Sequence, residues 1–281
     1  MISDRSLVEI GKTVCFQMAV EKDIESVQSF SGIEITDTDR SIHKIRKSLK
    51  SVSAILLLYK GRLDPVQYLS WKLFLKTLSK KYAFLREPYV YLQTFNQIEH
   101  KLIGLNNFNP DEIRNYLEIQ YKLIVNETIV NETIQQGDEA ILKLTETHND
   151  FHVSYKPKRL KRMLLKSFKK SERLFKKLRL TSSHEAYHGF RKWCKIFYYQ
   201  LAVLHRIELV NSSKNNKRLY KLTDYLGKEH DLQLFFQYLV VHFPEFSVSS
   251  ESFFRLRIKK LRKKILVLYP RLINYGINVC R

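Results

Sequence analysis

Two stretches of 17 residues decide the fold, and they are built alike. Residues 43–59 read HKIRKSLKSVSAILLLY, and residues 188–204 read HGFRKWCKIFYYQLAVL. In each stretch the apolar residues recur at helical spacing and would share one face, while His, Arg and Lys gather on the other face. We therefore predict two amphipathic helices, each with a core face and a column of hydrogen-bond donors that contains no carboxylate.

The two donor columns have the same spacing, His-x-x-Arg-Lys-x-x-Lys, and lie 145 residues apart. The candidate binding residues in these columns are His43, Arg46, Lys47, Lys50, His188, Arg191, Lys192 and Lys195. A second matched pair of segments, residues 82–87 and 226–231, follows at an offset of 144. A nearly constant offset indicates an internal duplication, so we predict two related helical halves, residues 1–150 and 151–281.

Two further segments are predicted to form strongly basic helices. In residues 158–180 the candidate contacts share one narrow face, and they are Arg162, Lys166, Lys169 and Arg173. Around the apolar seam of residues 251–268 we select Arg255, Lys259 and Arg262. Prolines punctuate the first half, and we expect Pro65, Pro88, Pro110 and Pro157 to divide it into short pieces.

The charge of the chain is high and unevenly distributed. Its 281 residues carry 49 Lys and Arg against 28 Asp and Glu, a net charge of +21. Residues 1–40 and 102–153 are net acidic, at −4 and −6, whereas residues 41–101 and 154–281 are net basic, at +9 and +22. Charge that served only solubility would be spread evenly along the sequence. We therefore expect one strongly basic surface and a polyanionic partner.

The composition excludes several classes of protein. The 8 Gly and 6 Pro are too few for a turn-rich all-β fold. Cys15, Cys194 and Cys280 form no CxxC pair, so we predict neither a disulfide framework nor a thiolate zinc site. The donor columns place cations where a metal needs neutral or anionic ligands, so we expect no metal and no cofactor. No leader and no bilayer-spanning apolar run is visible, so we expect a cytoplasmic protein that does not bind membranes.

The matched segments carry a family resemblance. The run from His188 to Leu201, with the box Leu226-Gly227-x-x-His230-Asp231 after it, resembles the second half of a CHAD domain, the conserved histidine α-helical domain. The spacing His43-x-x-Arg46-x-x-x-Lys50, followed by Leu85-Arg86-Glu87, is similar to the first half. The resemblance covers about residues 1–270. The family often has a further basic residue ten positions after each histidine, where this chain has Ser53 and Tyr198.

The resemblance implies an all-α fold over residues 1–281, with two four-helix bundles in tandem and pseudo-twofold symmetry around a basic groove. It implies binding of inorganic polyphosphate and association with polyphosphate granules. The matching site residues are His43, Arg46, Lys50, His188, Arg191 and Lys195. The chemistry agrees, because polyphosphate has no base edge or stacking face, so charge and donor geometry must recognise it. We predict non-catalytic binding that weakens with salt.

Two other functions stay open. A phosphoanhydride hydrolase would need carboxylates to hold Mg²⁺ beside the cations, but the acidic residues lie mostly in separate blocks and no Walker A loop is present. A nucleic-acid-binding protein would use the same basic faces. However, Trp193, Phe197 and Tyr199 are expected in the core rather than among the cations as stacking platforms. Nucleic-acid binding is therefore kept as the alternative, weak binding is expected, and the oligomeric state is left open.

Overall fold

The part of the chain that the structure describes folds almost entirely into helices, which confirms the predicted all-α class. The computed structural model describes residues 14–28, 38–102, 109–125, 132, 154–181, 183–211 and 214–279. In chain order the elements are β1 (Val14–Cys15), α2 (Phe16–Gln28), α3 (Thr38–Tyr59), α4 (Pro65–Ile98), η1 (Glu99–Lys101), α5 (Pro110–Ile124), β2 (Ser154–Tyr155), α7 (Pro157–Thr181), α8 (His184–Arg206), α9 (Lys214–His242), α10 (Pro244–Leu268), η2 (Pro270–Leu272) and α11 (Ile273–Val279). The strands β1 and β2 pair antiparallel and tie the described start of the first half to the start of the second.

Capping side chains and prolines set where several helices begin. Asp64 accepts hydrogen bonds from the backbone N–H groups of Val66 and Gln67, at 2.9 and 3.0 Å, and so caps α4. Pro65, Pro110 and Pro157 each occupy the first position of a helix, where a missing N–H costs nothing. These three prolines therefore divide the chain as predicted.

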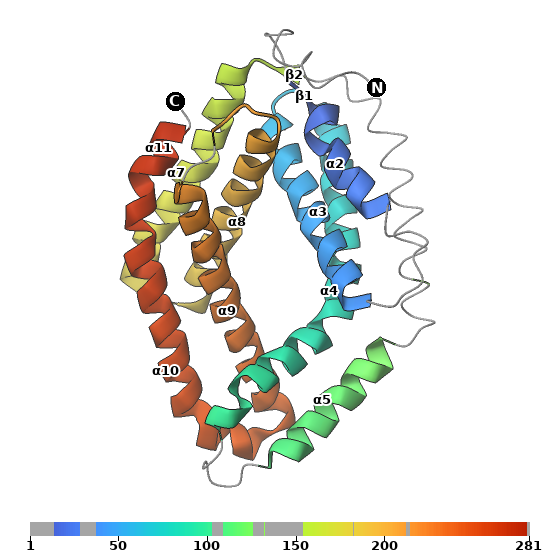
Figure 1. The fold of residues 1–281 in the computed structure, drawn as a ribbon, viewed down its shortest axis with the longest axis vertical. Coiled ribbons are helices and arrows are strands. Elements are labelled where there is room, and N and C mark those ends of the chain that lie inside the picture. The colour runs from blue at the N-terminus through green and yellow to red at the C-terminus, as the bar shows by residue number, and fades with distance from the viewer. Residues whose placement is uncertain are drawn as a thin grey trace.

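Pro88 does not divide the chain, which corrects one expectation. It lies inside α4, a helix of 34 residues that continues through it. A proline in a helix interior removes one hydrogen bond and crowds the preceding turn, which bends the helix. Figure 1 shows α4 running beside α3 and then turning toward α9 and α10. The bend carries the second part of α4 away from α3, so one helix reaches both ends of the molecule.

The buried apolar side chains form two separate clusters. The first cluster packs α2, α3 and the start of α4 against α7, α8 and the start of α9. The second packs the end of α4 and α5 against the end of α9 and the start of α10, with Phe95 and Phe235 at 6.4 Å between ring centroids. Each cluster contains side chains from before and after residue 150, so the packing joins the two halves of the sequence.

Buried polar contacts fix α8 against the first half of the chain. The Gln200 side-chain amide donates to the backbone carbonyl of Ala54 at 2.8 Å, which joins α8 to α3. Arg206 pairs with Asp23 at 2.9 Å and donates to the carbonyl of Ala19, which joins α8 to α2. Because buried hydrogen bonds need one geometry, these contacts set how α3 and α8 face each other. In the part of the chain that the structure describes, no helix is both long and apolar enough to cross a membrane.

Candidate functional site

A polar cavity of about 640 Å³ lies where α3, α4, α8, α9 and α10 meet. It borders both apolar clusters, since Tyr198 packs against the first cluster and Leu232 belongs to the second. Its lining is rich in cations. The Lys and Arg side chains of the lining are Arg46, Lys47, Lys50, Arg86, Lys195, Lys228, Arg257, Lys260 and Lys264. His43 also lines this cavity, and the only carboxylates of the described lining are Asp224 and Asp231.

The first donor column reaches the cavity from α3. His43 lies three and four residues before Arg46 and Lys47, and Lys50 lies four and three residues after them, so all four share one side of the helix. The apolar side of α3 is buried in the first cluster and fixes the rotation of the helix. Arg46 donates from Nη1 to the backbone carbonyl of Ser79 on α4, at 3.3 Å. The column is therefore held in place by core packing below it and by a backbone contact beside it.

The second donor column meets the first on the other wall. Lys195, on α8, lines the same cavity as Lys50. Arg191, one turn earlier, lies just behind the lining, close enough for its charge to lower the pKa of Arg46, after burial and Arg86. Two segments 145 residues apart in sequence thus contribute to one site. His188 and Lys192 are exposed on α8 and do not line the cavity.

In the part of the chain that the structure describes, the central cations make no direct ion pair, although the charge of Asp231 reaches them. Elsewhere in the protein, partly buried arginines are paired, as Arg262 is with Glu229 at 2.8 Å. In the described chain Lys50, Lys195 and Arg191 make no hydrogen bond or ion pair, and the buried Nε of Arg191 has no partner. Partly desolvated cations without partners are costly, because burial penalises the charged form. Such an arrangement leaves the donors available to an anionic ligand.

Burial and mutual repulsion shift the protonation of these groups. Burial first, and then the charges of Lys195 and Arg46, lower the pKa of Lys50 to about 7. Burial, followed by the charge of Arg191, lowers the pKa of Lys195 to about 8. Burial is also the main cause that lowers the pKa of His43, with Arg86 next. A bound polyanion would reverse these shifts, because a negative charge favours the protonated lysine.

Of the two residues in the motif His230-Asp231, Asp231 lines the cavity and His230 does not. Asp231 lines the cavity, where burial raises the pKa of its carboxyl although Arg191 and Lys195 oppose the shift. The His230 ring lies near two histidines of α8, at 5.4 Å from His188 and 6.2 Å from His184 between ring centroids. Burial and then Arg191 lower the pKa of His230 to about 3, so the ring is neutral at physiological pH. Within the described residues no group of His, Cys, Asp and Glu could hold a metal ion.

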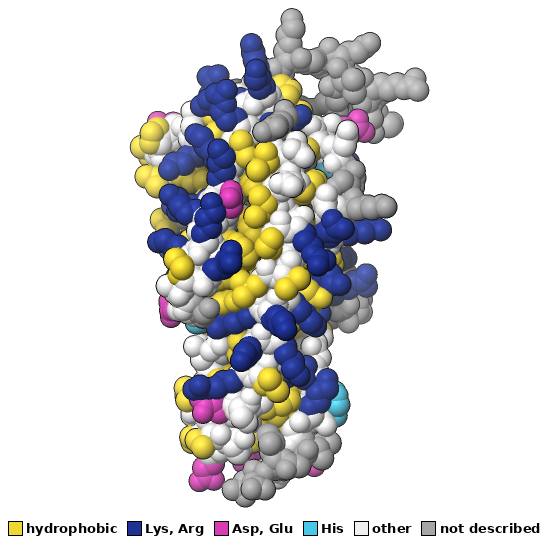
Figure 2. Space-filling model, turned by 90° about the vertical axis from the view of Figure 1, so that its left-hand side faces the viewer, with side chains coloured by type: hydrophobic (Ala, Val, Ile, Leu, Met, Phe, Trp, Pro, Cys, Tyr) yellow, Lys and Arg dark blue, Asp and Glu magenta, His cyan; other side chains and the backbone are white. Residues whose placement is uncertain are grey.

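The basic column of α7 lies apart from this cavity. Lys166, Lys169 and Arg173 line a separate hollow of about 730 Å³ with Met163 and Trp193. Arg162 is exposed on α7 and lines neither space. Figure 2 shows the face that carries α7 and α10, where Lys and Arg side chains gather beside a strip of hydrophobic side chains. The outer face is therefore a second basic surface, and its cations are solvated.

The side of α10 that faces the cavity is not the side that was selected from the sequence. Arg255 and Lys259 are exposed and do not line the cavity. Arg262 pairs with the buried Glu229 and lies over the Tyr187 ring at 4.2 Å, so it links α10 to α9 and α8. The α10 cations that do line the cavity are Arg257, Lys260 and Lys264. Their three- and four-residue steps were visible in the sequence, but the flank that faces the cavity depends on packing against α9.

Several other lining residues were not selected from the sequence as contacts, among them an arginine and three tyrosines. Arg86 comes from α4, pairs with Asp39 at 3.6 Å and belongs to the segment matched to residues 226–231. Tyr198, Tyr199 and Tyr220 form an aromatic part of the wall. Tyr199 was expected in the core, but it lines the cavity beside Lys195. The core face of α8 is narrower than its periodicity suggested, which leaves tyrosines at its margin.

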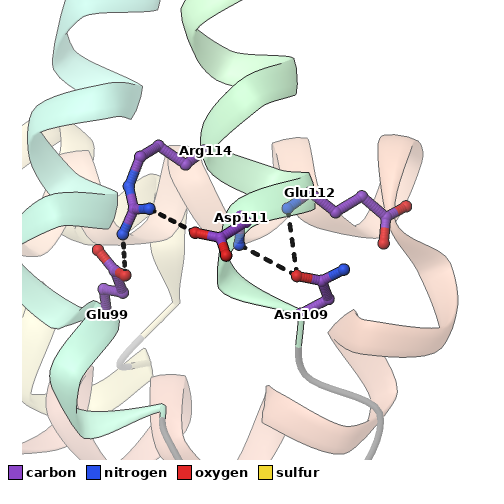
Figure 3. Close-up of polar contacts among 5 residues, drawn as sticks. All are labelled: Glu99, Asn109, Asp111, Glu112 and Arg114. Atoms are coloured by element: carbon purple, nitrogen blue, oxygen red, sulfur yellow. Dashed lines mark hydrogen bonds and ion pairs between the residues drawn. The ribbon is translucent and has the colours of Figure 1, made fainter.

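Acidic residues cluster at the far end of the molecule, at the start of α5. Asn109 caps this helix by accepting from the backbone N–H groups of Asp111 and Glu112, at 3.2 and 3.4 Å. Arg114 bonds Asp111 at 2.6 Å and pairs with Glu99 of η1 (Figure 3). A backbone cap and an arginine thus hold these residues at the start of α5, and none of them lines the cavity.

The chain was compared with known proteins. The sequence model of the CHAD domain matches residues 19–239. Among solved structures, the crystal structure of the CHAD domain from the plant Ricinus communis is similar, with a TM-score of 0.56 and 16% sequence identity. That similarity covers 96% of this chain and 94% of the plant chain, and at such low identity it speaks for the fold alone. No curated protein matches the chain. Since the family match spans most of the sequence and both segments that contribute to the cavity, this protein belongs to the CHAD domain family.

Proposed function

We propose that this protein binds long inorganic polyphosphate in the central cavity and does so without catalysis. The observation that carries the proposal is the set of desolvated cations on α3 and α8 that make no ion pair in the described chain, above all Lys50, Lys195 and Arg191. Burial and mutual repulsion of these cations destabilise the folded state, and a bound polyanion would offset that free-energy cost. Binding of this kind would attach the protein to polyphosphate granules in the cytoplasm.

The shape of the basic lining suits a linear chain of phosphates. Arg257, Lys260 and Lys264 continue the cationic wall along α10, over seven residues or about 10 Å of helix. Arginine offers a two-pronged donor to phosphate oxygens, and lysine offers a point charge. Because the same unit repeats along polyphosphate, a row of such donors can be satisfied without any particular register.

We propose further that the two halves arose by duplication and form tandem bundles related by a pseudo-twofold axis through the cavity. The constant sequence offset supports this proposal. The meeting of Lys50 with Lys195, which occupy equivalent places in the two columns, supports it as well.

We propose binding rather than hydrolysis because of the state of the two carboxylates in the described lining. Asp224 accepts a hydrogen bond from Lys228 at 2.9 Å, and Asp231 lies among Lys50, Lys195 and Arg191. A hydrolase of phosphoanhydrides normally uses carboxylates to hold Mg²⁺ at the transferred phosphate. Carboxylates so close to fixed cations are poorly suited to that task, since the cations compete with the metal.

Calorimetric titration tests the proposal. The purified protein is titrated with long-chain polyphosphate and, separately, with single-stranded RNA, at roughly 50 and 200 mM salt. We expect polyphosphate to bind more tightly than RNA at both salt concentrations and to displace it in competition. Equal affinities for the two polymers would favour the alternative, a general binder of nucleic-acid backbones. Loss of phosphate from the polymer during incubation would contradict the non-catalytic part of the proposal.

A further inference from the structure

A second pocket adjoins the basic cavity. It has a volume of about 660 Å³ and lies between the end of α8 and the start of α9. Three residues line both spaces, Tyr198, Tyr220 and Asp224, so the pocket and the cavity meet at these side chains. A ligand in the cavity that passes these side chains reaches the pocket.

The chemistry of this pocket differs from that of the cavity. Leu201, Ala202 and Leu219 contribute apolar surface, and Tyr220 presents a ring that is 61% exposed. The Tyr198 ring lies beside it, at 6.2 Å between centroids and tilted by 49°. An exposed aromatic ring above an apolar floor favours a flat, uncharged ring system as its ligand.

Inorganic polyphosphate could use the lysines of this pocket, Lys217 and Lys221, but it gives no reason for the apolar floor. Its oxygens need donors, and an apolar floor offers none. A ligand that satisfies both spaces must join a chain of phosphates to an aromatic ring. Nucleotides with several phosphates have this composition, and their bases stack on tyrosine side chains.

We propose that the cavity and the pocket together bind a nucleoside oligophosphate, with the phosphates on the cations around Lys50 and Lys195 and the base against Tyr220. The inference rests on the proposed function, because the phosphate chain uses the same cations. The base-edge contacts would come from the polar rim of the pocket, where His205 and Lys217 lie. A polyphosphate chain that ends in a nucleoside would then be held at its end as well as along its length.

The experiment compares two ligands with equal numbers of phosphates, adenosine 5′-tetraphosphate and inorganic tetraphosphate, by calorimetric titration of the full chain. The ester removes one ionisable oxygen from the nucleotide, so charge alone would make it the weaker ligand. We expect it instead to bind about tenfold more tightly, because one stacked base contributes to affinity. Adenosine without phosphates is expected to bind weakly, since it lacks the charged part of the ligand.

Three variants test whether Tyr220 is the cause of the tighter binding of the nucleotide. Because Tyr220 also lines the cavity, the ratio of the two affinities is the readout, and Tyr220→Leu should remove the preference for the nucleotide over inorganic tetraphosphate. Tyr220→Phe keeps the ring and should keep the preference. Phe84→Leu is the matched control, because Phe84 is an exposed aromatic residue outside both spaces, and it should change neither affinity.

The outcomes separate this inference from the proposed function. If inorganic tetraphosphate binds and the nucleoside adds nothing, this inference is wrong and the proposed function stands. If Tyr220→Phe and Tyr220→Leu weaken both ligands alike, the tyrosine acts through its hydroxyl on phosphate, and the base contact is refuted. If neither ligand nor long polyphosphate binds, the proposed function fails, and the inference fails with it.

Discussion

At the scale of single residues, the cavity shows a conflict between stability and binding. Lys50 sits on a helix whose other face is core, and its ammonium group is partly desolvated beside Arg46 and near Lys195. It makes no hydrogen bond or ion pair in the described chain, and the opposing charge of Asp231 offsets only part of the shift in its pKa. Groups arranged in this way are costly for folding and useful for binding, which is a common relation at functional sites.

Replacing Lys50 by an apolar residue should therefore stabilise the fold. We predict that Lys50→Met raises the free energy of unfolding by about 1–2 kcal/mol at neutral pH, because it removes a partly buried charge among like charges. The same change should weaken polyphosphate binding at least tenfold. Chemical denaturation and titration measure the two effects. Lys47→Met, at an exposed position of the same column, should change stability by less than about 0.5 kcal/mol. Loss of stability in Lys50→Met would contradict this account of the site.

The lowered lysine pKa values predict how binding depends on pH. Lys50, with a pKa of about 7, and Lys195, with a pKa of about 8, lose their charge as the pH rises through those values in the free protein. Polyphosphate binds the protonated forms, so affinity should fall between pH 6.5 and 9 and binding should take up protons. Titrations in buffers of different ionisation enthalpy measure this uptake. Lys50→Arg should reduce the uptake, because arginine stays charged. A pH-independent affinity would show that both lysines are already fully protonated.

The lowered pKa values of Lys50 and Lys195 also determine whether stability rises or falls with pH. Each lysine has a lower pKa in the folded state than in the unfolded chain, so the unfolded state binds more protons at intermediate pH. The free energy of unfolding therefore rises with pH from about 7 toward the ordinary lysine value near 10.4, as far as these two groups contribute. Binding and stability thus change in opposite directions over this range.

At the scale of elements, helix contacts decide which side chains reach the cavity. Arg262 was a candidate contact from the sequence, but it pairs with Glu229, whose side chain is 2% exposed. Its role in the structure is to hold α10 against α9. The apolar seam of α10 predicted the helix, yet the partner of each flank was not encoded in the periodicity. Pro88 is similar, since its effect on α4 depends on the second apolar cluster that the bent helix reaches.

Loss of the Arg262 contact should destabilise the protein. We predict that Arg262→Met lowers the free energy of unfolding by about 3–5 kcal/mol, because it leaves the carboxylate of Glu229 buried without its partner. Arg255→Met is the matched control, because Arg255 pairs with Glu251 at the surface and should cost at most about 1 kcal/mol. Thermal or urea denaturation measures both. Similar small costs for the two variants would mean that α10 is held mainly by its apolar seam.

A glycine in α11 offers a second test of element packing. A Cβ at Gly276 would overlap the ring of Phe168 on α7, which is buried and cannot move aside freely. Gly276→Ala should therefore destabilise the protein by about 1–3 kcal/mol, although alanine favours helices. Gly189→Ala, in the interior of α8 with no atom within 4 Å of the added Cβ, should stabilise it by up to about 1 kcal/mol. If both variants gain stability, α11 does not pack on α7 as described.

At the scale of the whole molecule, the sequence predicted more of the fold than of the site. Helical periodicity gave the all-α class, and the equal spacing of the two donor columns pointed to Lys50 and Lys195, which line one cavity. The separation of the α7 column from that cavity could not be predicted, since a helix face alone does not tell which neighbours flank it. The tyrosines at the margin of α8 and α9 were hidden for the same reason. Periodicity assigns a face to each residue, and tertiary packing decides what that face meets.

The most direct test of the central claim compares two pairs of lysines that differ in place but not in charge. Lys50→Gln/Lys195→Gln removes two cations from the cavity, and Lys166→Gln/Lys169→Gln removes two from the outer hollow on α7. Affinity for long-chain polyphosphate is measured by calorimetry at one salt concentration. We predict a loss of at least about 100-fold for the cavity pair and about threefold for the outer pair. Equal losses, or a larger loss for the outer pair, would contradict the claim and would show that the polyanion binds the basic surface as a whole.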